Sequence, residues 1–388
     1  MELPSVGDIV ALLDELYDPR RAEEWDAVGT AVGDPRAPVH KVLFAVDPVQ
    51  AVVAEAATWG ADLLITHHPL LLKGVTSVAA NTPKGGVVHA LITAGTALHT
   101  CHTNADSPAG GVSEALAVSL GLHDLRPLEA HEATPLDKWA VFVPPDDADA
   151  VSQAMASAGA GAIGDYDRCT FTSAGVGSFR PLDGANPTIG TVGEVAHVPE
   201  DRLEMVAPRR VRAAVLAALR STHPYEEPAF DVLEMASTDD ETRGSGRIGT
   251  LADGVTLADF ARGVVDALPH THSVARVAGD PAREVRTVAV CGGSGDFLLD
   301  RARDLGADVF VTSDLKHHRV SEAQEHSGAP AVIDVPHWAA EWTWLPVVER
   351  RLLDALAAQE ATVETRVSRI VTDPWTMHMP WPGDDYAS

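Results

Sequence analysis

The sequence has few cysteines and no long apolar run, and each shortage excludes a class of protein. Only Cys101, Cys169 and Cys291 are present, without a C-x-x-C pair. This argues against a disulfide scaffold and a thiolate zinc site, and favours a reducing compartment. No apolar run approaches ~18 residues, so no segment is expected to span a membrane. The expected location is the cytoplasm.

Basic residues are also scarce, and the 388-residue chain carries a net charge of −27. Such a surface repels phosphate backbones and anionic lipids, and no Lys/Arg run supplies a basic patch. We therefore expect neither nucleic-acid nor membrane binding. The first residues, MELPSVGDIVALLDELYD, lack a basic segment before an apolar one. They predict an amphipathic helix and not a signal peptide.

Two stretches of the sequence resemble one another and indicate a repeated βαβ unit. Residues 40–68 and 285–318 each contain a β-branched strand, an amphipathic helix, Gly-Ala-Asp and a second strand that leads to a His pair. A further helix and strand follow each copy. Chance similarity of two ordinary βαβ units is the alternative. Parallel sheets that present polar residues at the carboxyl ends of their strands are the expected result.

The segment between these copies has a different order of predicted strands and helices, which indicates a separate domain. Residues 128–246 follow the order β-α-β-β-α-β of the ferredoxin-like fold. The stretch STDDETRGSGRIG, rich in charge and glycine, is interpreted as the linker that leaves it. The predicted fold class is α/β, with two similar βαβ-containing halves, residues 1–127 and 247–388, forming one domain. An inserted α+β ferredoxin-like domain interrupts it.

Polar residues follow the predicted strands. His67 and His68 come directly after the apolar run ADLLIT. Because neighbouring side chains on a strand point to opposite faces, the pair can serve one ion only from the loop beyond the strand, or else it serves two ions. An ordinary strand end with backbone hydrogen bonds is the other interpretation. Asp106, before Ser107 and Pro108, fits either a helix N-cap or a carboxylate offered to a cation.

His337 and Glu341, in DVPHWAAEW, are four residues apart and share one face of a helix that begins at Pro336. The same spacing occurs on solvated helices, but the nearby tryptophans argue against a solvated face. Together, the three imidazoles and two carboxylates suit zinc, iron or manganese. Five ligands exceed the need of one tetrahedral ion, so two divalent ions per chain are predicted.

These motifs, in this order, resemble those of a family of dinuclear-metal proteins, the GTP cyclohydrolase 1 type 2 homologues, also called NGG1-interacting-factor-like proteins. The resemblance covers nearly the whole chain. It rests on EEWDAVGTAVGDP, ADLLITHHPLLLKGV, HTNADSPAGGVSEALAVSLGL, VTSDLKHH and DVPHWAAEW. The inserted STHPYEEPAFDV resembles the PII/CutA-like insert of longer members. The chain departs from the family in TSD, where Thr-Gly-Asp is usual, and in Pro336, where Gly is common.

The resemblance implies a ligand set for the two ions and two residues beside them. The implied ligands are His67, His68, Asp106, His337 and Glu341. His102 and Asp314 are placed near the site, where each could act catalytically as an acid or orient a ligand through a hydrogen bond. The resemblance also implies a homo-oligomer, commonly a hexamer.

Two functions are compatible with these features. The first is a dinuclear metal-dependent hydrolase, in the family's naming a GTP cyclohydrolase, in which activated water attacks a purine-type ring or an amide-like bond of a nucleotide or other small molecule. GGSG at 292–295 could hold phosphate, but lacks the P-loop lysine. The second is a non-catalytic metal-binding oligomeric scaffold or a metal-storage or sensing protein. HPYEEP at 223–228 is either a ligand motif of the insert or a structural turn.

Overall fold

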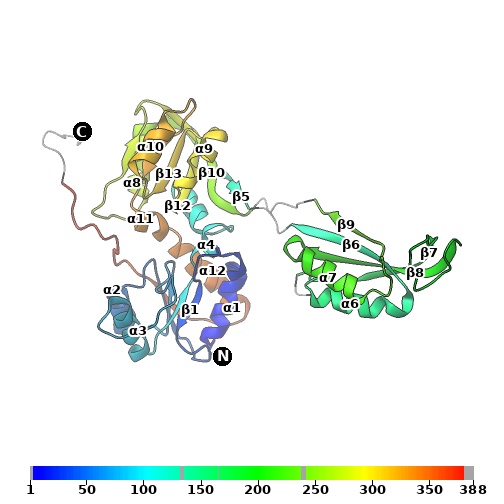
Figure 1. Cartoon of the computed structure of the whole chain (residues 1–388). Helices are drawn as coiled ribbons and strands as arrows, with labels where there is room; N and C mark the ends of the chain where they lie inside the picture. Colours follow the sequence, from blue (N-terminus) through cyan, green and yellow to red (C-terminus); the bar gives the residue numbers. More distant parts are fainter. Residues whose placement is uncertain (1–2, 132–134, 165, 237–241, 380–388) are drawn as a thin grey trace. The chain divides into compact units, whose positions relative to one another are not determined.

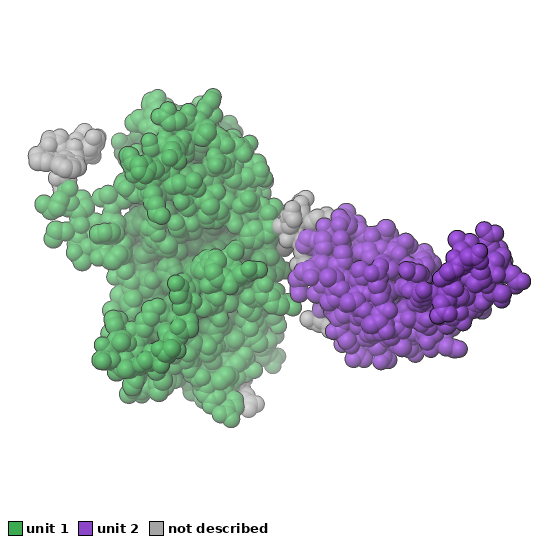
Figure 2. All heavy atoms as spheres, in the orientation of Figure 1, with its two compact units in different colours: residues 1–131, 241–388 green, residues 132–240 purple. Residues whose placement is uncertain are grey.

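A computed structural model of the chain describes residues 3–131, 135–164, 166–236 and 242–379. The chain divides into two compact units, which Figure 2 distinguishes by colour. Unit 1 comprises Met1–His131 and Glu241–Ser388, and unit 2 comprises Glu132–Asp240. Among the described residues, unit 1 forms two sheets and unit 2 forms one. No helix in the described part of the chain is long and apolar enough to cross a membrane.

The first sheet of unit 1 has the strand order β1-β4-β3-β2-β15 (Figure 1). Its strands are β1 (Gly29–Val32), β2 (Lys41–Ala45), β3 (Leu63–Thr66), β4 (Ala97–Thr100) and β15 (Glu364–Val367). β2, β3 and β4 run parallel, and helices α2 (Gln50–Trp59) and α3 (Pro83–Ala94) connect them. Every residue of β3 and β4 is buried, as expected for parallel strands that are covered on both faces.

The second sheet has the order β11-β14-β13-β12-β10-β5. Its strands are β5 (His123–Ala130), β10 (Gly244–Thr256), β11 (Arg276–Ala278), β12 (Glu284–Ser294), β13 (Val309–Ser313) and β14 (Ala331–Asp334). Helices α9 (Leu299–Asp304) and α10 (His317–Gln324) connect the parallel trio β12, β13 and β14. The order β14-β13-β12 repeats the order β4-β3-β2 of the first sheet. The predicted repetition of the βαβ unit is therefore confirmed.

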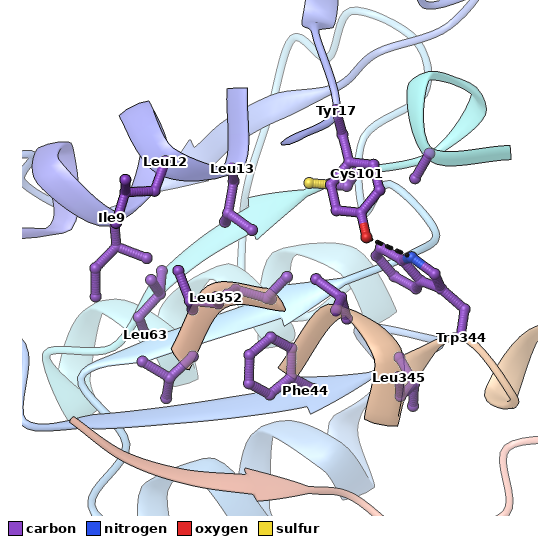
Figure 3. Packing of buried hydrophobic residues seen from close by; sticks show 14 of the residues in the cluster. Ile9, Leu12, Leu13, Tyr17, Phe44, Leu63, Cys101, Trp344, Leu345 and Leu352 are labelled. Atoms are coloured by element: carbon purple, nitrogen blue, oxygen red, sulfur yellow. Dashed lines mark hydrogen bonds between the residues drawn. The ribbon is translucent and has the colours of Figure 1, made fainter. Parts of the chain in front are cut away.

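Helix α1 (Val6–Leu16) is the amphipathic helix that the sequence predicts, and its apolar face packs in the core with α12 (Leu345–Ala358). Figure 3 shows Ile9 and Leu13 pointing into this core. Beside them, the Trp344 indole Nε1 donates to the Tyr17 hydroxyl at 3.1 Å (Figure 3). The remaining α-helices of unit 1 are α4 (Thr103–Asp106), α5 (Val112–Ser119), α8 (Leu257–Ala267) and α11 (His337–Trp342).

The glycine-rich stretch after the insert is a strand, and the prediction of a linker is wrong for this part of it. Gly244–Thr256 forms β10, which pairs with β5 and β12. A Cβ atom at Gly244 would lie 2.1 Å from the Glu129 carbonyl oxygen, so glycine here permits the close approach of two strands. Residues 237–241 of the predicted linker lie outside the described residues. The predicted domain boundaries, at 128 and 246, fall inside β5 and β10.

Unit 2 follows the chain order β-α-β-β-α-β and has one antiparallel sheet of order β7-β8-β6-β9. Its elements are β6 (Leu136–Val143), α6 (Ala148–Ser157), β7 (Phe171–Phe179), β8 (Ala196–Pro208), α7 (Arg212–Thr222) and β9 (Phe230–Glu234). Trp139, Met155 and Leu219 belong to the apolar core between the sheet and the two helices.

A buried ion pair fixes the start of α7 to the sheet of unit 2. The Asp137 side chain on β6 is fully buried, and Arg212 donates to its two oxygens from Nε and Nη2 at 2.7 Å each. Arg209 makes a longer contact, at 3.4 Å. The hydrogen bonds from Arg212 hold the pKa of Asp137 below its usual value, against the opposing effect of burial.

We expect Arg212→Leu to destabilise unit 2 by about 1–3 kcal/mol, because Asp137 then stays buried with one weaker partner. In hydrogen exchange of the whole chain, amides of β6 and β9 should exchange about tenfold faster or more, with those of β2 unchanged. Arg210→Leu, at an exposed neighbouring position, is the control. Equal exchange in both variants would contradict this role of the pair.

The same pair predicts a pH dependence. Because the pKa of Asp137 is lowered on folding, its contribution is fully present above the unfolded value of about 3.9 and is lost as the pH falls below it. The difference in urea midpoint between wild type and Arg212→Leu should therefore be largest near pH 7 and shrink under acid conditions. A difference that grows as the pH falls would show that another interaction dominates.

Candidate metal centre

Six polar side chains of unit 1 meet where strands of both its sheets end. His67 and His68 follow β3 directly, in the loop beyond the strand that the sequence interpretation allowed. His102 and Asp106 follow β4, at the two ends of the short helix α4. His337 and Glu341 lie on α11, which begins one residue after the predicted start, with Pro336 as its N-cap.

The Glu341 carboxylate lies at the middle of this cluster, with 3% of the residue exposed. Its Oε1 is 2.7 Å from His337 Nε2 and 3.4 Å from His67 Nε2, and its Oε2 is 3.1 Å from His68 Nε2. His67 Nε2 also lies 3.6 Å from Asp106 Oδ1. All five residues that were predicted as ligands are thus brought together, and the i, i+4 spacing on α11 places its two side chains in contact.

Each histidine is held by its Nδ1 nitrogen, which faces an oxygen acceptor. The pairs are His67 with the Cys101 carbonyl (3.0 Å), His68 with Asp47 (2.7 Å), His102 with Asp26 (2.8 Å) and His337 with Asp314 (2.6 Å). Since an oxygen acceptor requires Nδ1 to carry a proton, Nε2 is the nitrogen that each ring, once neutral, offers to a metal ion. The imidazoles are therefore fixed in the tautomer and orientation that metal ligation requires.

The charges of the cluster are strongly coupled. Burial alone would raise the pKa of Glu341, but the neighbouring His68, His67 and His337 outweigh it and hold that pKa well below its usual value. Asp106 behaves in the opposite way. Desolvation and the nearby Glu341 carboxylate raise the pKa of Asp106 to about 7. Protein groups alone therefore leave the negative charge of Asp106 without enough positive charge nearby, and a cation bound at this position would balance it.

Two buried atoms in the cluster have no hydrogen-bond partner, and this observation tests whether a metal fits. They are His67 Nε2 and Glu341 Oε2. Buried polar atoms are nearly always satisfied, so two exceptions in one cluster need an explanation. The described residues contain two sets of possible donor atoms, and within each set the atoms lie within 4.8 Å of one another. One set comes from His67, His68 and His102, and the other from His68, His337 and Glu341. Imidazole and carboxylate donors in this arrangement fit divalent metal ions.

The structure corrects the N-cap interpretation of Asp106 and modifies the prediction for His102. Asp106 is the last residue of α4, and the next helix, α5, is capped by Gly111, so the interpretation of Asp106 as an N-cap is wrong. The carboxylate is therefore free to face the cluster. His102, predicted beside the ligands, lies in one of the two donor sets itself. Asp314 lies against His337 in the left-handed region, at φ 58°, a conformation that aspartate tolerates better than most residues.

The GGSG motif is part of this centre and not a phosphate loop. Its first three residues belong to strand β12, and Gly293 has a positive φ of 69°. A Cβ atom at Gly293 would lie 2.7 Å from Glu341 Oε1. Glycine is needed here for its backbone conformation and for the room it leaves to the carboxylate.

Sequence reasoning missed Asp26 and Asp47, which orient two of the imidazoles. Asp47 directly follows the apolar run of β2, so the rule that polar residues gather at strand ends could have found it. Asp26 lies within EEWDAVGTAVGDP, far from any His in sequence, and gives no local signal. Burial would raise the pKa of Asp26, but hydrogen bonds from His102 and Thr103 hold it well below its usual value.

Arg247 holds the loop that follows Asp106. Its side chain is buried on β10, and its Nη2 donates to the carbonyls of Ser107 and Pro108 at 3.0 and 2.8 Å. Its Nε pairs with Glu114 at 3.2 Å. One guanidinium therefore satisfies backbone carbonyls that would otherwise be buried without partners.

A cavity of about 630 Å³ opens beside His68 and His337. The segment after β15 forms one of its walls, with Trp375 and Met377 exposed towards solvent. Thr372 in this segment hydrogen-bonds to Asp47, and Asp373 accepts from Ser273 Oγ at 2.6 Å. The acidic residues of the lining are Asp47, Asp314, Asp334 and Asp373, and its one arginine is Arg276, which is paired with Asp334.

Comparison with known proteins identifies the family. The sequence model of Duf34/NIF3 (NGG1p interacting factor 3) matches residues 4–374. A Mycobacterium tuberculosis protein named GTP cyclohydrolase 1 type 2 homolog is 47% identical over 375 residues, which cover 96% of this chain and 97% of the relative. A Bacillus subtilis protein of the same name is 38% identical, over 95% of this chain and 98% of the relative.

Two solved structures extend the similarity to the fold. A Bacillus cereus protein related to NIF3 has a TM-score of 0.68 and 34% identity, over 97% of this chain and 100% of that chain. A Staphylococcus aureus protein has a TM-score of 0.73 and 28% identity, with the same coverage. The chain belongs to the Duf34/NIF3 family.

Proposed function

We propose that this protein is a dinuclear metal-dependent hydrolase. The observation that carries the proposal is the set of three imidazoles, those of His67, His68 and His337, whose Nε2 atoms face the buried Glu341 beside an open cavity. The proposed ligands are His67, His68, Asp106, His337 and Glu341, for two zinc, iron or manganese ions. Glu341 presents its two oxygens to different imidazoles, which suits a carboxylate between two ions.

When bound, the two ions would supply Lewis-acid activation of a water molecule and of the electrophilic atom of the substrate. The chain's own residues position the histidine ligands and supply a proton to the leaving group. Asp314 and Asp47 hold the rings of His337 and His68 in place. His102, held by Asp26 with its Nε2 towards the cluster, is the candidate acid for a leaving nitrogen. For Asp314, the contact with His337 favours the orienting role over a catalytic one.

The substrate that we propose is a small molecule with a planar ring or an amide-like bond. Relatives are named after GTP cyclohydrolase, which suggests a purine-type ring. The cavity supplies an exposed indole, Trp375, on which a ring can stack. Its four carboxylates oppose an anion and its one arginine is already paired, so attraction for a triphosphate would have to come from the two ions and from the histidines of the lining.

A non-catalytic metal-binding scaffold, or a storage or sensing protein, is the second candidate. The burial of Glu341 and His67 favours this candidate, because two of the proposed ligands are then almost inaccessible to solvent. The side chains of His68 and His337 are 25% and 30% exposed and line the cavity, which favours the hydrolase. An open coordination position distinguishes a catalytic site from a closed structural one.

We further propose that unit 2, the predicted domain 128–246 without its ends in β5 and β10, is a ferredoxin-like insert of the PII/CutA kind between the two halves of unit 1. The strand order of unit 2, with β6 and β8 at its centre, supports this. A homo-oligomer, in hexameric form on the family resemblance alone, and a cytoplasmic location complete the proposal. The three unpaired cysteines support the location.

Elemental analysis of chelator-free protein should find about two divalent ions per chain in the wild type. The variant with both His67→Ala and Glu341→Ala should lose them, because it removes donors from both sets. His317→Ala with His318→Ala, an exposed pair outside the cluster, should keep both ions. A wild type that neither contains nor takes up stoichiometric divalent metal would overturn the dinuclear site and the hydrolase with it.

His102→Asn distinguishes an acid from a ligand. If His102 protonates the leaving group, the variant should keep its metal content and lose about 10²–10⁴-fold in turnover of the best substrate from a screen of nucleotides and amides. Asp26→Asn should retain metal and show a smaller loss, because it disturbs only the orientation of the ring. Loss of an ion in His102→Asn would instead make this histidine a ligand.

Gly293→Ala should impair the centre without removing any donor. The substitution places a Cβ atom against Glu341 and strains a residue with positive φ, at a cost of about 1–2 kcal/mol in stability. We expect reduced metal content by elemental analysis. Gly263→Ala, on α8 with open space around the new methyl group, is the matched control and should be neutral or stabilising. Unchanged metal affinity in Gly293→Ala would show that Glu341 is free to move.

A further inference from the structure

The HPYEEP motif at 223–228 is not used by the metal centre, which lies in unit 1. In unit 2 it forms one wall of a cavity of about 440 Å³, a volume within the range of small-molecule sites. The opposite walls come from the end of β7 and from the loop between β7 and β8. The cavity lies wholly within unit 2.

Within the motif, His223 is structural. It is buried, its Nδ1 accepts the backbone N–H of Tyr225 at 3.1 Å, and its Nε2 lies 3.0 Å from the Phe142 carbonyl, to which it donates. Both ring nitrogens are therefore occupied by main-chain groups. The ring packs edge-on against Tyr225 at 5.1 Å between centroids. His223 thus holds the turn in the shape that presents Tyr225 to the cavity.

The loop between β7 and β8 is tied to the same turn and closes the cavity. Thr188 Oγ1 donates to the Pro224 carbonyl at 2.9 Å, and the Asn186 N–H donates to Glu226 Oε2 at 3.0 Å. These bonds join residues 36 and 40 positions apart in the chain. Phe142, Pro181 and Ile189 supply apolar lining.

Two polar groups in the cavity, the Tyr225 hydroxyl and the Glu200 carboxylate, lie near one another without a basic partner among the described residues. The Tyr225 hydroxyl is buried and lies near the Glu200 carboxylate, and among the described residues it makes no hydrogen bond of standard geometry. Glu200, on β8, forms no ion pair with any lysine or arginine of the described chain, and Arg202, two residues further on, pairs with Glu204 instead at 3.1 Å. Burial and the nearby Glu200 raise the pKa of Tyr225 to about 12, so the hydroxyl stays protonated.

The position of Glu200 depends on a glycine of the neighbouring strand. A Cβ atom at Gly177 would lie 2.0 Å from Glu200 Oε2 and 2.6 Å from its Cδ. Because φ at Gly177 is not in the left-handed region, the reason for a glycine here is the room that it leaves for the Glu200 side chain and not its backbone conformation. The backbone of β7 thus leaves room for a carboxylate directly against it, at the edge of the cavity.

The charge and the aromatic lining indicate the ligand class. Glu200, Glu226 and Glu227 face one arginine, Arg180, so the lining carries excess negative charge. The rings of Phe179 and Tyr225 stand 6.1 Å apart at 57°. Aromatic faces next to carboxylates are the combination that binds organic ammonium ions, through ion pairing and cation–π attraction.

We propose that this cavity of unit 2 binds a small organic cation, an ammonium group on an apolar body. Glu200 and the Tyr225 hydroxyl bind the ammonium head, the rings of Phe179 and Tyr225 flank it, and Phe142 and Ile189 contact the apolar body. The HPYEEP motif is then a ligand motif as well as a turn.

The probe for the test is 2-phenylethylammonium, titrated calorimetrically into the whole metal-loaded chain up to about 10 mM. We expect saturable binding at one site per chain. The neutral analogue 2-phenylethanol and the anion phenylacetate should bind at least about tenfold more weakly, because each lacks the charge that Glu200 pairs with. This comparison uses only the wild type, so it does not depend on the folding of any variant.

Variants then locate the site. Glu200→Gln keeps the shape and removes the charge, and should weaken binding about tenfold or more, while Tyr225→Phe should weaken it less. Glu194→Gln removes an equal charge outside the lining and should change nothing. Metal content should be the same in all three variants. Absence of saturable binding, tighter binding of phenylacetate, or equal affinity in Glu200→Gln and wild type would each overturn the proposal.

Discussion

The arrangement of unit 1 depends on one buried carboxylate, that of Glu341. An acidic side chain with 3% exposure is costly unless opposite charge or metal surrounds it. Three imidazoles provide those surroundings, two from the end of β3 and one from the same turn of α11. The two halves of the chain must therefore meet at this point, because neither half alone brings together the acid and all its partners.

Elements far from one another in the sequence serve this constraint. Asp47, at the end of β2, fixes His68, and the equivalent strand of the other sheet, β12, supplies the glycine that clears space for Glu341. Trp344, just beyond α11, packs on His67 and is itself held by Tyr17. The hydrophobic core and the polar centre thus share residues. A change in packing near α1 would therefore alter the positions of the histidine rings.

The sequence was sufficient for the features that follow from local pattern. The βαβ repeats, helix α1 and the pairing of His337 with Glu341 depend on periodicity or on i, i+4 spacing, and the structure confirms them. Features that depend on contacts between distant segments were missed. Gly244–Gly249 has the composition of a linker but pairs between two strands, and Asp26 reaches His102 across 76 residues. The composition of a segment indicates how freely its backbone can move, but it does not indicate which strands the segment will pair with.

The attachment of unit 2 has a consequence for how such a chain changes over time. The insert leaves at the end of β5 and returns at the start of β10, where Ala130 faces Gly244 and the His131 N–H donates to the Arg243 carbonyl at 3.1 Å. The residues at which the chain leaves and re-enters the host sheet are thus paired with each other on adjacent strands. A tight hairpin turn would close the same gap, so a whole domain can be gained or lost at the level of the gene while the register of the host sheet stays intact.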